Sequence, residues 1–153
     1  MKIYVRNAKA HGYKAAQIKK AAEFYAAQLM TNRLSRTLTI YIRFDSNMIF
    51  SGLATWLDEP VRGKEYSIKL NPTDKEDSIY QTLAHEMVHI KQYAKGELRD
   101  LLTIEDQVTW QGARHKANNE GRDYLNQPWE QEAFKREVDL YALYLKHVDI
   151  KSF

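Results

Sequence analysis

The sequence predicts a small α+β domain in which short strands lie between helices. Apolar residues recur at helical spacing in three stretches, 14–31, 75–95 and 128–147. Between the first two, apolar and polar residues alternate in 37–44, as they do in a strand with one buried face. The length of 153 residues suits one globular domain, 1–153, and we find no internal repeat and no linker.

The first 36 residues are strongly basic. They hold eight lysine or arginine residues and one acidic residue, Glu23, for a charge of +7, whereas the remaining 117 residues carry −4. We assign 1–36 to a basic N-terminal arm followed by a helix. Such a segment attracts polyanions, which makes it a candidate for weak nucleic-acid contact, although solvated lysine-rich helix faces are common. Tyr4, Tyr13 and Tyr25 lie among these charges and could either stack on single strands or pack in the core.

The first helix is expected at 14–31, which is rich in alanine, the strongest helix former. Its apolar stripe consists of Ile18, Ala21, Ala22, Tyr25 and Leu29. A strand is expected at 37–44. Its buried face consists of Leu38, Ile40, Ile42 and Phe44.

Two more strands are expected before the second helix. Residues 48–57, MIFSGLATWL, are predicted as a strand that is interrupted or bulged near Gly52. Residues 65–70, EYSIKL, are the next strand, and Pro60 and Gly63 mark the turn before it. The sequence thus predicts a short mixed or antiparallel sheet of three to four strands.

A long second helix is expected at 75–95. The preceding Asn-Pro-Thr-Asp at 71–74 offers a turn and a helix cap, and Gly96 is a C-terminal stop. Its apolar face consists of Ile79, Leu83, Met87 and Ile90. Residues 97–127 are polar, and only 107–111 reads as a short strand.

Composition excludes several classes of protein. Because the chain has no cysteine, it has no disulfide, no thiolate zinc site and no cysteine nucleophile. No apolar run approaches the roughly 20 residues that a membrane-spanning helix needs. The first ten residues lack the apolar core of a secretory signal. We therefore expect a soluble, cytoplasmic protein without membrane contact.

The strongest chemical signal is HEMVH at 85–89, which has the pattern HExxH. Residues four apart on a helix lie one turn above each other, so His85 and His89 can bind one metal ion. Glu86 lies beside them and can reach a water molecule at that ion, where it would serve as general base and then as proton donor. The pattern is typical of zinc hydrolases of the metalloprotease kind. The alternative without a metal site is a helix with two surface histidines on either side of a glutamate.

A catalytic zinc ion needs a third protein ligand, which in this chain must be His, Asp or Glu. The candidates outside the motif are Glu97, Glu105, His115, Glu120, Glu130 and Glu132. The last helix, 128–147, begins at Pro128, because proline is tolerated in a first turn. Within it Glu130 shares a mostly apolar stripe with Phe134, whereas Glu132 lines up with charged residues. We therefore favour Glu130 over Glu132, although Glu130 alone would suggest only a carboxylate stabilised by the helix dipole.

Four further side chains could assist such a site. Glu137 lies one turn beyond Glu130 on the same stripe, where it could orient a metal ligand or pair with a buried arginine. The oxygen of a reacting carbonyl group would need a second donor besides the metal. Candidates for that donor are His115, Tyr124 and Tyr141.

Three segments resemble the small SprT-like metallopeptidases encoded by bacteriophages. They are HEMVH after SIKLNP, WQG at 110–112, and YLNQPWEQEA at 124–133, and the resemblance runs from about Thr37 to the last helix. It implies a zincin-like fold of gluzincin type, one catalytic Zn²⁺ held by two histidines and a downstream glutamate on the C-terminal helix, and the cytoplasm of a bacterium or a phage-infected host. Glu130 three residues before Ala133 resembles the ligand position of other gluzincins.

The chain also departs from related families. It has neither the third histidine nor the cysteine-rich zinc ribbon of SprT-like proteins related to the DNA–protein-crosslink protease. The resemblance therefore implies zinc binding and hydrolysis, but not a role in DNA repair. The favoured function is zinc-dependent endopeptidase activity on a protein or peptide substrate, with Glu86 as general base. The alternatives are a nucleic-acid-associated protein or a regulatory protein-binding module on a zincin fold with little or no turnover.

Overall fold

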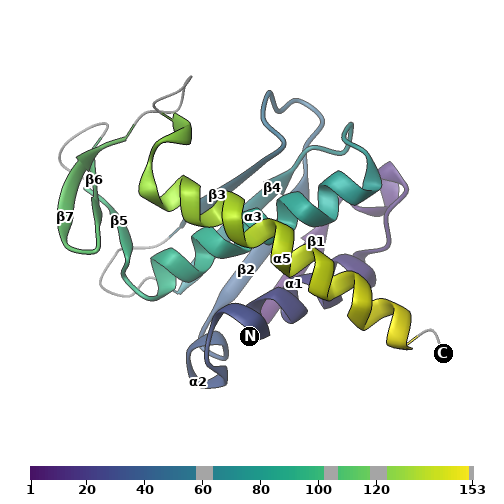
Figure 1. The fold of residues 1–153 in the computed structure, drawn as a ribbon. Coiled ribbons are helices and arrows are strands. Elements are labelled where there is room, and N and C mark those ends of the chain that lie inside the picture. Colours follow the sequence, from purple (N-terminus) through teal and green to yellow (C-terminus); the bar gives the residue numbers. More distant parts are fainter. Residues whose placement is uncertain (58–63, 102–106, 118–123, 152–153) are drawn as a thin grey trace.

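The structure is a computed structural model that describes residues 1–57, 64–101, 107–117 and 124–151 (Figure 1). The described elements, in chain order, are β1 (Lys2–Arg6), η1 (Lys9–His11), α1 (Ala15–Leu29), α2 (Asn32–Ser35), β2 (Thr39–Phe44), β3 (Gly52–Trp56), β4 (Glu65–Leu70), α3 (Glu76–Ala94), β5 (Leu98–Asp100), β6 (Gln107–Trp110), β7 (Ala113–Lys116) and α5 (Pro128–Lys151). The α+β class predicted from the sequence is confirmed.

The main sheet has four strands in the order β1-β2-β4-β3. The strands β1, β2 and β4 run parallel to one another, and β3 runs antiparallel to β4 at one edge of the sheet. Figure 1 shows α1, α3 and α5 on the same side of this sheet. The helices α3 and α5 pack against each other, and α3 also contacts β3 and β4. The sheet thus holds α3 from one side while α5 covers it from the other.

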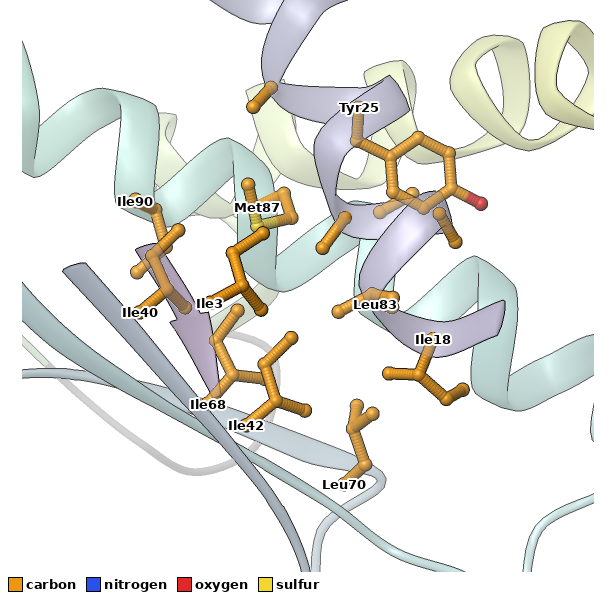
Figure 2. Close-up of a cluster of buried hydrophobic side chains, with 14 of the residues drawn as sticks. Ile3, Ile18, Tyr25, Ile40, Ile42, Ile68, Leu70, Leu83, Met87 and Ile90 are labelled. Carbon is orange, nitrogen blue, oxygen red and sulfur yellow. The ribbon is translucent and has the colours of Figure 1, made fainter. Parts of the chain in front are cut away.

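The core lies between the sheet and the helices α1 and α3. Alternate strand residues, among them Ile40, Ile42 and Ile68, are fully buried and point toward the helices (Figure 2). Leu83 and Met87 of α3 meet them from above. Because residues branched at Cβ fit the pleated surface of a strand, and leucine and methionine, which are not branched at Cβ, suit a helix, local preference and packing agree here.

The long elements agree with the sequence predictions. Helices were expected at 14–31, 75–95 and 128–147, and α1, α3 and α5 are confirmed within a few residues at most ends. Gly96 ends α3 with a positive φ of 73°, as expected for a glycine stop. The turn before α3 is built by Asn71, whose side-chain oxygen accepts hydrogen bonds from the backbone N–H and the hydroxyl of Thr73. The expected side-chain cap is absent from α3, because its N-cap residue is Lys75.

Three strand predictions were wrong or incomplete. The N-terminal arm was not expected to form a strand, but Lys2–Arg6 pairs in parallel with β2. The strand expected at 48–57 is shorter, because it begins only at Gly52. In 97–127 a single strand was expected, whereas β5, β6 and β7 form a second, antiparallel sheet. The turn expected at Pro60 and Gly63 lies outside the described residues.

A tight turn explains why the second sheet was missed. The strands β6 and β7 are joined by Gln111 and Gly112, both with positive φ, at 50° and 87°. Two positive φ values are the requirement of a type I′ hairpin turn. Glutamine is an unusual residue at its first position, so the sequence carries only half of the signal.

Within the described residues no helix has the combination of length and hydrophobicity that a bilayer crossing requires.

Candidate metal centre

Two histidines and one glutamate meet where α3 packs against the first turn of α5. The Nε2 atom of His85 lies 3.0 Å from Oε1 of Glu130, and the Nε2 atom of His89 lies 2.9 Å from its Oε2. The two Nε2 atoms are 3.2 Å apart. All three residues are at most 8% exposed, so the helix pair encloses them. The structure thus brings together the two histidines and the glutamate that the sequence analysis favoured.

The spacing of these donor atoms fits a small divalent cation. Ligands about 2.0–2.1 Å from a tetrahedral zinc ion lie about 3.3 Å from one another. The observed separations of 2.9–3.2 Å are close to this value. When one possible ligand atom is taken from each residue, all three atoms lie within 4.8 Å of one another. Two imidazoles and a carboxylate suit zinc and also manganese or iron, so the donor set indicates a divalent metal without selecting one.

A glutamine behind His89 fixes the orientation of its ring. Both amide hydrogens of Gln92 are used, because its nitrogen donates to the Trp129 carbonyl at 2.9 Å and to Glu132 Oε1 at 2.8 Å. The amide oxygen must then accept from Nδ1–H of His89, at 2.8 Å. In neutral His89 the proton therefore lies on Nδ1, and the lone pair of Nε2 points at Glu130. Such outer hydrogen bonds orient histidine ligands in metal sites.

Positive charge is needed between His89 and Glu130, because a lone pair and a carboxylate oxygen face each other there. A metal cation or a proton can supply it. Burial alone would lower the pKa of His89, but the hydrogen bond and the charge of Glu130 outweigh burial and raise it to about 9. Burial would raise the pKa of Glu130, yet hydrogen bonds from both histidines hold it well below its ordinary value. The carboxylate is thus ionised and ready to bind a cation.

His85 is held by contacts on its other side. Its Nδ1 atom lies 3.7 Å from Oε2 of Glu137, within ion-pair range. The ring of Phe134 packs edge-on against the imidazole, with centroids 4.6 Å apart. Glu137 therefore approaches the candidate ligand His85 from behind, the position that the sequence analysis considered for it.

Glu86 lies beside the three ligands in a tight space. Its side chain is 5% exposed, and its carboxylate accepts a hydrogen bond from the backbone N–H of Ala54 in β3. Burial raises the pKa of Glu86, although the two histidines partly oppose this. A Cβ atom on Gly52 would lie 3.0 Å from Glu86 Oε1 and 2.6 Å from Thr82 Cγ2. Only glycine therefore lets β3 approach α3 this closely.

The three residues considered as hydrogen-bond donors to a reacting carbonyl oxygen, Tyr124, Tyr141 and His115, lie in different places. The Tyr124 hydroxyl donates to Glu130 Oε1 at 2.8 Å, so it reaches the centre. The hydroxyl of Tyr141 donates to Asp77 at an exposed position, and the His115 ring packs edge-on against Trp129. Of these three described residues, Tyr124 is the one that hydrogen-bonds to a candidate ligand of the centre.

Glu132 supports the centre from outside. Its carboxylate accepts from Lys91 Nζ at 2.7 Å and from the amide of Gln92. Lys91 is only 3% exposed and also pairs with Glu97 at 2.8 Å. The side chain of Glu132 is 26% exposed, so it is partly buried and not simply on the solvent side. Two other candidates for the third ligand, Glu105 and Glu120, lie outside the described residues.

Sequence reasoning missed Gln92 and Lys91. Gln92 lies three residues after His89, which places it on the same face of the helix, and this spacing is a signal that could have found it. The burial of Lys91 has no comparable signal, because an isolated lysine in a helix is usually exposed.

Two cavities border Glu86. The larger, of about 730 Å³, is lined by Phe50, Leu53, Phe134, His85 and Glu137 among others. The smaller, of about 160 Å³, is lined by His89, Glu130 and Trp129 among others. Both are lined by Gly52, Leu53, Glu86 and Tyr124. The candidate centre is therefore accessible to a ligand from a wide, mainly apolar side.

No protein-family model matches the chain, and the searches of curated proteins and of solved structures found no match either. The case for a function therefore depends on the site itself.

Proposed function

We propose that the protein is a zinc-dependent endopeptidase with a zincin-like site. The observation that carries the proposal is the convergence of His85, His89 and Glu130 beside a buried Glu86 that borders a large cavity. A site with only a structural role has no use for a carboxylate next to its ligands. A catalytic site needs such a group as a base.

The chemistry divides between the ion and the chain. When bound, zinc would lower the pKa of a water molecule toward about 7 and polarise the carbonyl group of a peptide bond. Glu86 would accept the proton of the attacking water and pass it to the leaving amine. Burial raises the pKa of Glu86, which brings it closer to the value that suits a group with both tasks. The Tyr124 hydroxyl, which donates to Glu130 in this structure, would turn its hydrogen from Glu130 to the oxygen of the reacting carbonyl group.

The edge strand β3 offers a backbone to an extended peptide. Asn71 N–H donates to the Ser51 carbonyl and Leu57 N–H to the Glu65 carbonyl, so these odd-numbered positions face β4. In an antiparallel pair the direction alternates, which turns the backbone groups of Gly52 and Ala54 away from β4. The N–H of Ala54 already donates to Glu86, so the groups offered to a substrate are the N–H and C=O of Gly52 and the C=O of Ala54. A substrate strand could pair there, with an apolar side chain in the large cavity.

The test combines metal analysis with peptide cleavage. We expect the purified protein to bind one zinc ion, and the zinc-loaded protein to cleave members of a proteome-derived peptide library, read by mass spectrometry. Glu86→Gln should keep the zinc but lower the cleavage rate by a factor of about 10³ or more, because the base is lost. Glu23→Gln, at an exposed position of α1, is the matched control and should cleave like the parent.

Two results would contradict the proposal. Zinc binding without cleavage of any library member would favour the alternative of a binding module without turnover. Equal cleavage by the parent and by Glu86→Gln would show that another protein in the preparation is responsible.

A further inference from the structure

The face of the main sheet opposite α1 and α3 is polar and exposed. In β1 and β2 the buried residues alternate with Tyr4 and Arg6, and with Tyr41 and Arg43, which are exposed. Parallel strands usually have both faces covered, so an uncovered face on three parallel strands is uncommon. On β1, β2 and β4 its side chains are mostly charged, aromatic or hydroxyl-bearing, which favours a charged or aromatic partner over a purely apolar one.

Three cations form one row across this face. The strand register places Arg6 opposite Arg43 and Arg43 opposite Lys69. Neighbouring strands are about 4.8 Å apart, and like charges directly opposite each other destabilise a sheet. None of the salt bridges recorded for the described residues includes any of the three. A bound polyanion would remove the repulsion.

Two tyrosines form the adjacent row. Tyr4 lies opposite Tyr41, and their rings stack with centroids 5.4 Å apart and planes 17° from parallel. The residues remain 49% and 36% exposed. The row lies about 7 Å from the cations, because residues two apart in a strand have this spacing. Lys2 adds a charge at the other end of β1, and Glu65 is the one acidic strand residue on this face among those described.

We propose that this face, defined by Tyr4, Tyr41, Arg6, Arg43 and Lys69, binds single-stranded nucleic acid. Bases stack on aromatic rings whatever their sequence, and cations beside the rings hold the phosphates. The bases of a duplex are already stacked on one another, so a stacking platform prefers single strands. The face is separate from the candidate metal centre, which lies between α3 and α5 on the other side of the sheet.

The structure also narrows the aromatic candidates from the basic segment. Tyr25 is fully buried and Tyr13 stacks on Phe44, so neither offers a free ring. Tyr4 remains, and its partner Tyr41 lies beyond residues 1–36. The register of the strands, which the sequence does not reveal, brings the two together.

The first experiment separates this face from general charge. A fluorescent oligothymidylate of about 20 nucleotides is titrated with the full chain at about 50 and 200 mM salt and read by anisotropy. The triple variant Arg6→Gln, Arg43→Gln and Lys69→Gln should bind at least about tenfold more weakly, with a salt slope smaller by about 2. The matched triple Lys14→Gln, Lys19→Gln and Lys20→Gln removes the same charge from the α1 segment and should change affinity less than about threefold. Equal losses in both triples would overturn the proposal.

The second experiment tests the rings. The double variant Tyr4→Ala and Tyr41→Ala should weaken binding about tenfold or more, whereas Tyr4→Phe with Tyr41→Phe should stay within about twofold, because phenylalanine still stacks. Both residues are exposed, and unchanged melting curves will show that the variants fold. Parent-like affinity of the alanine variant would overturn the proposal.

Two other polyanions complete the test. A duplex of the same length should bind more weakly than the single strand, and equal or tighter duplex binding would refute a stacking platform. Vesicles that contain phosphatidylserine should not displace the oligonucleotide. Binding to vesicles without binding to the oligonucleotide would assign the face to a lipid surface instead.

Discussion

Gln92 joins both helices of the candidate centre through one side chain. Its oxygen accepts from the ring of His89 on α3, and its nitrogen donates to Trp129 and Glu132 on α5. The orientation of the amide is therefore fixed by two acceptors, and it in turn fixes which nitrogen of His89 faces Glu130 and the candidate metal site. If a metal binds there, a residue outside the candidate ligand set sets how well His89 binds it.

We expect Gln92→Met to weaken zinc binding about 10- to 100-fold, the range found when outer hydrogen bonds to histidine ligands are removed. Methionine keeps roughly the volume of the side chain, but its sulfur is only a weak acceptor for the N–H of His89 and it has no hydrogen to donate to α5. Affinity is measured by competition with a chelator at constant pH. Gln28→Met, at an exposed position of α1, is the control and should bind zinc like the parent. An unchanged affinity of Gln92→Met in a normally folded protein would contradict this role.

Tyr124 and Tyr141 offer a matched pair for testing the second donor. Burial raises the pKa of Tyr124, so its hydroxyl keeps its hydrogen at neutral pH. If peptide cleavage is established, Tyr124→Phe should lower kcat about 100-fold, with KM and zinc affinity changed less than about threefold. Tyr141→Phe, which loses only an exposed bond to Asp77, should leave kcat unchanged. A parallel fall of kcat and zinc affinity would mean that the Tyr124 hydroxyl positions Glu130 and does not act on substrate.

At the scale of elements, the close approach of β3 to α3 depends on one glycine. We expect Gly52→Ala to destabilise the fold by about 1–3 kcal/mol, because its Cβ would lie 2.6 Å from Thr82 Cγ2. Thr82→Ser removes that methyl group, so the double variant should recover at least half of the lost free energy of unfolding, measured by urea titration.

The same pair separates stability from chemistry. The new Cβ would still lie 3.0 Å from Glu86 Oε1 in the double variant, so peptide cleavage should stay impaired even when stability returns. Thr82→Ser alone is the control. A Gly52→Ala protein as stable as the parent would show that the strand can move away at little cost.

Elements with a strong local pattern could be predicted, and those defined by pairing could not. The helix α3 combines an apolar stripe with a glycine stop, and both are properties of neighbouring residues. The strand β1 has five residues with three polar side chains, and it becomes a strand because β2 offers it a parallel partner far along the chain. Pairing across such distances leaves little trace in composition.

The candidate site shows the same division. His85, Glu86 and His89 follow from one motif, and helical phase was enough to prefer Glu130 over Glu132. Local spacing could not place Lys91, because its burial depends on two carboxylates that approach α3, those of Glu97 just before β5 and of Glu132 in α5. A buried lysine is stable only when such partners are present.

At the scale of the whole molecule, a tyrosine cluster joins all three long helices. The hydroxyl of Tyr25 in α1 donates to the backbone carbonyl of Tyr80 in α3 at 2.9 Å. Tyr144 of α5 packs against both rings, with centroids 5.6 and 5.7 Å away. The cluster lies at the junction that positions α3 and α5 relative to each other, and therefore supports the candidate centre from a distance.

This cluster should contribute to the alkaline limit of stability, together with the other tyrosines whose pKa burial raises. Burial raises the pKa of Tyr80 to about 12 and that of Tyr25 further, against about 10 in an unfolded chain. A raised pKa means that the folded state keeps the proton longer, so the contribution is complete below pH 10 and is lost as pH rises toward 12 and beyond. We expect urea midpoints to be steady near pH 9 and to fall above about pH 10, together with the appearance of tyrosinate absorbance on unfolding.

Tyr25→Phe should cost about 1 kcal/mol at neutral pH through its lost hydrogen bond, but its urea midpoint should fall less steeply in alkali than that of the parent. Tyr4→Phe, at an exposed position, should behave like the parent, and an equally steep fall in Tyr25→Phe would show that other groups set the limit.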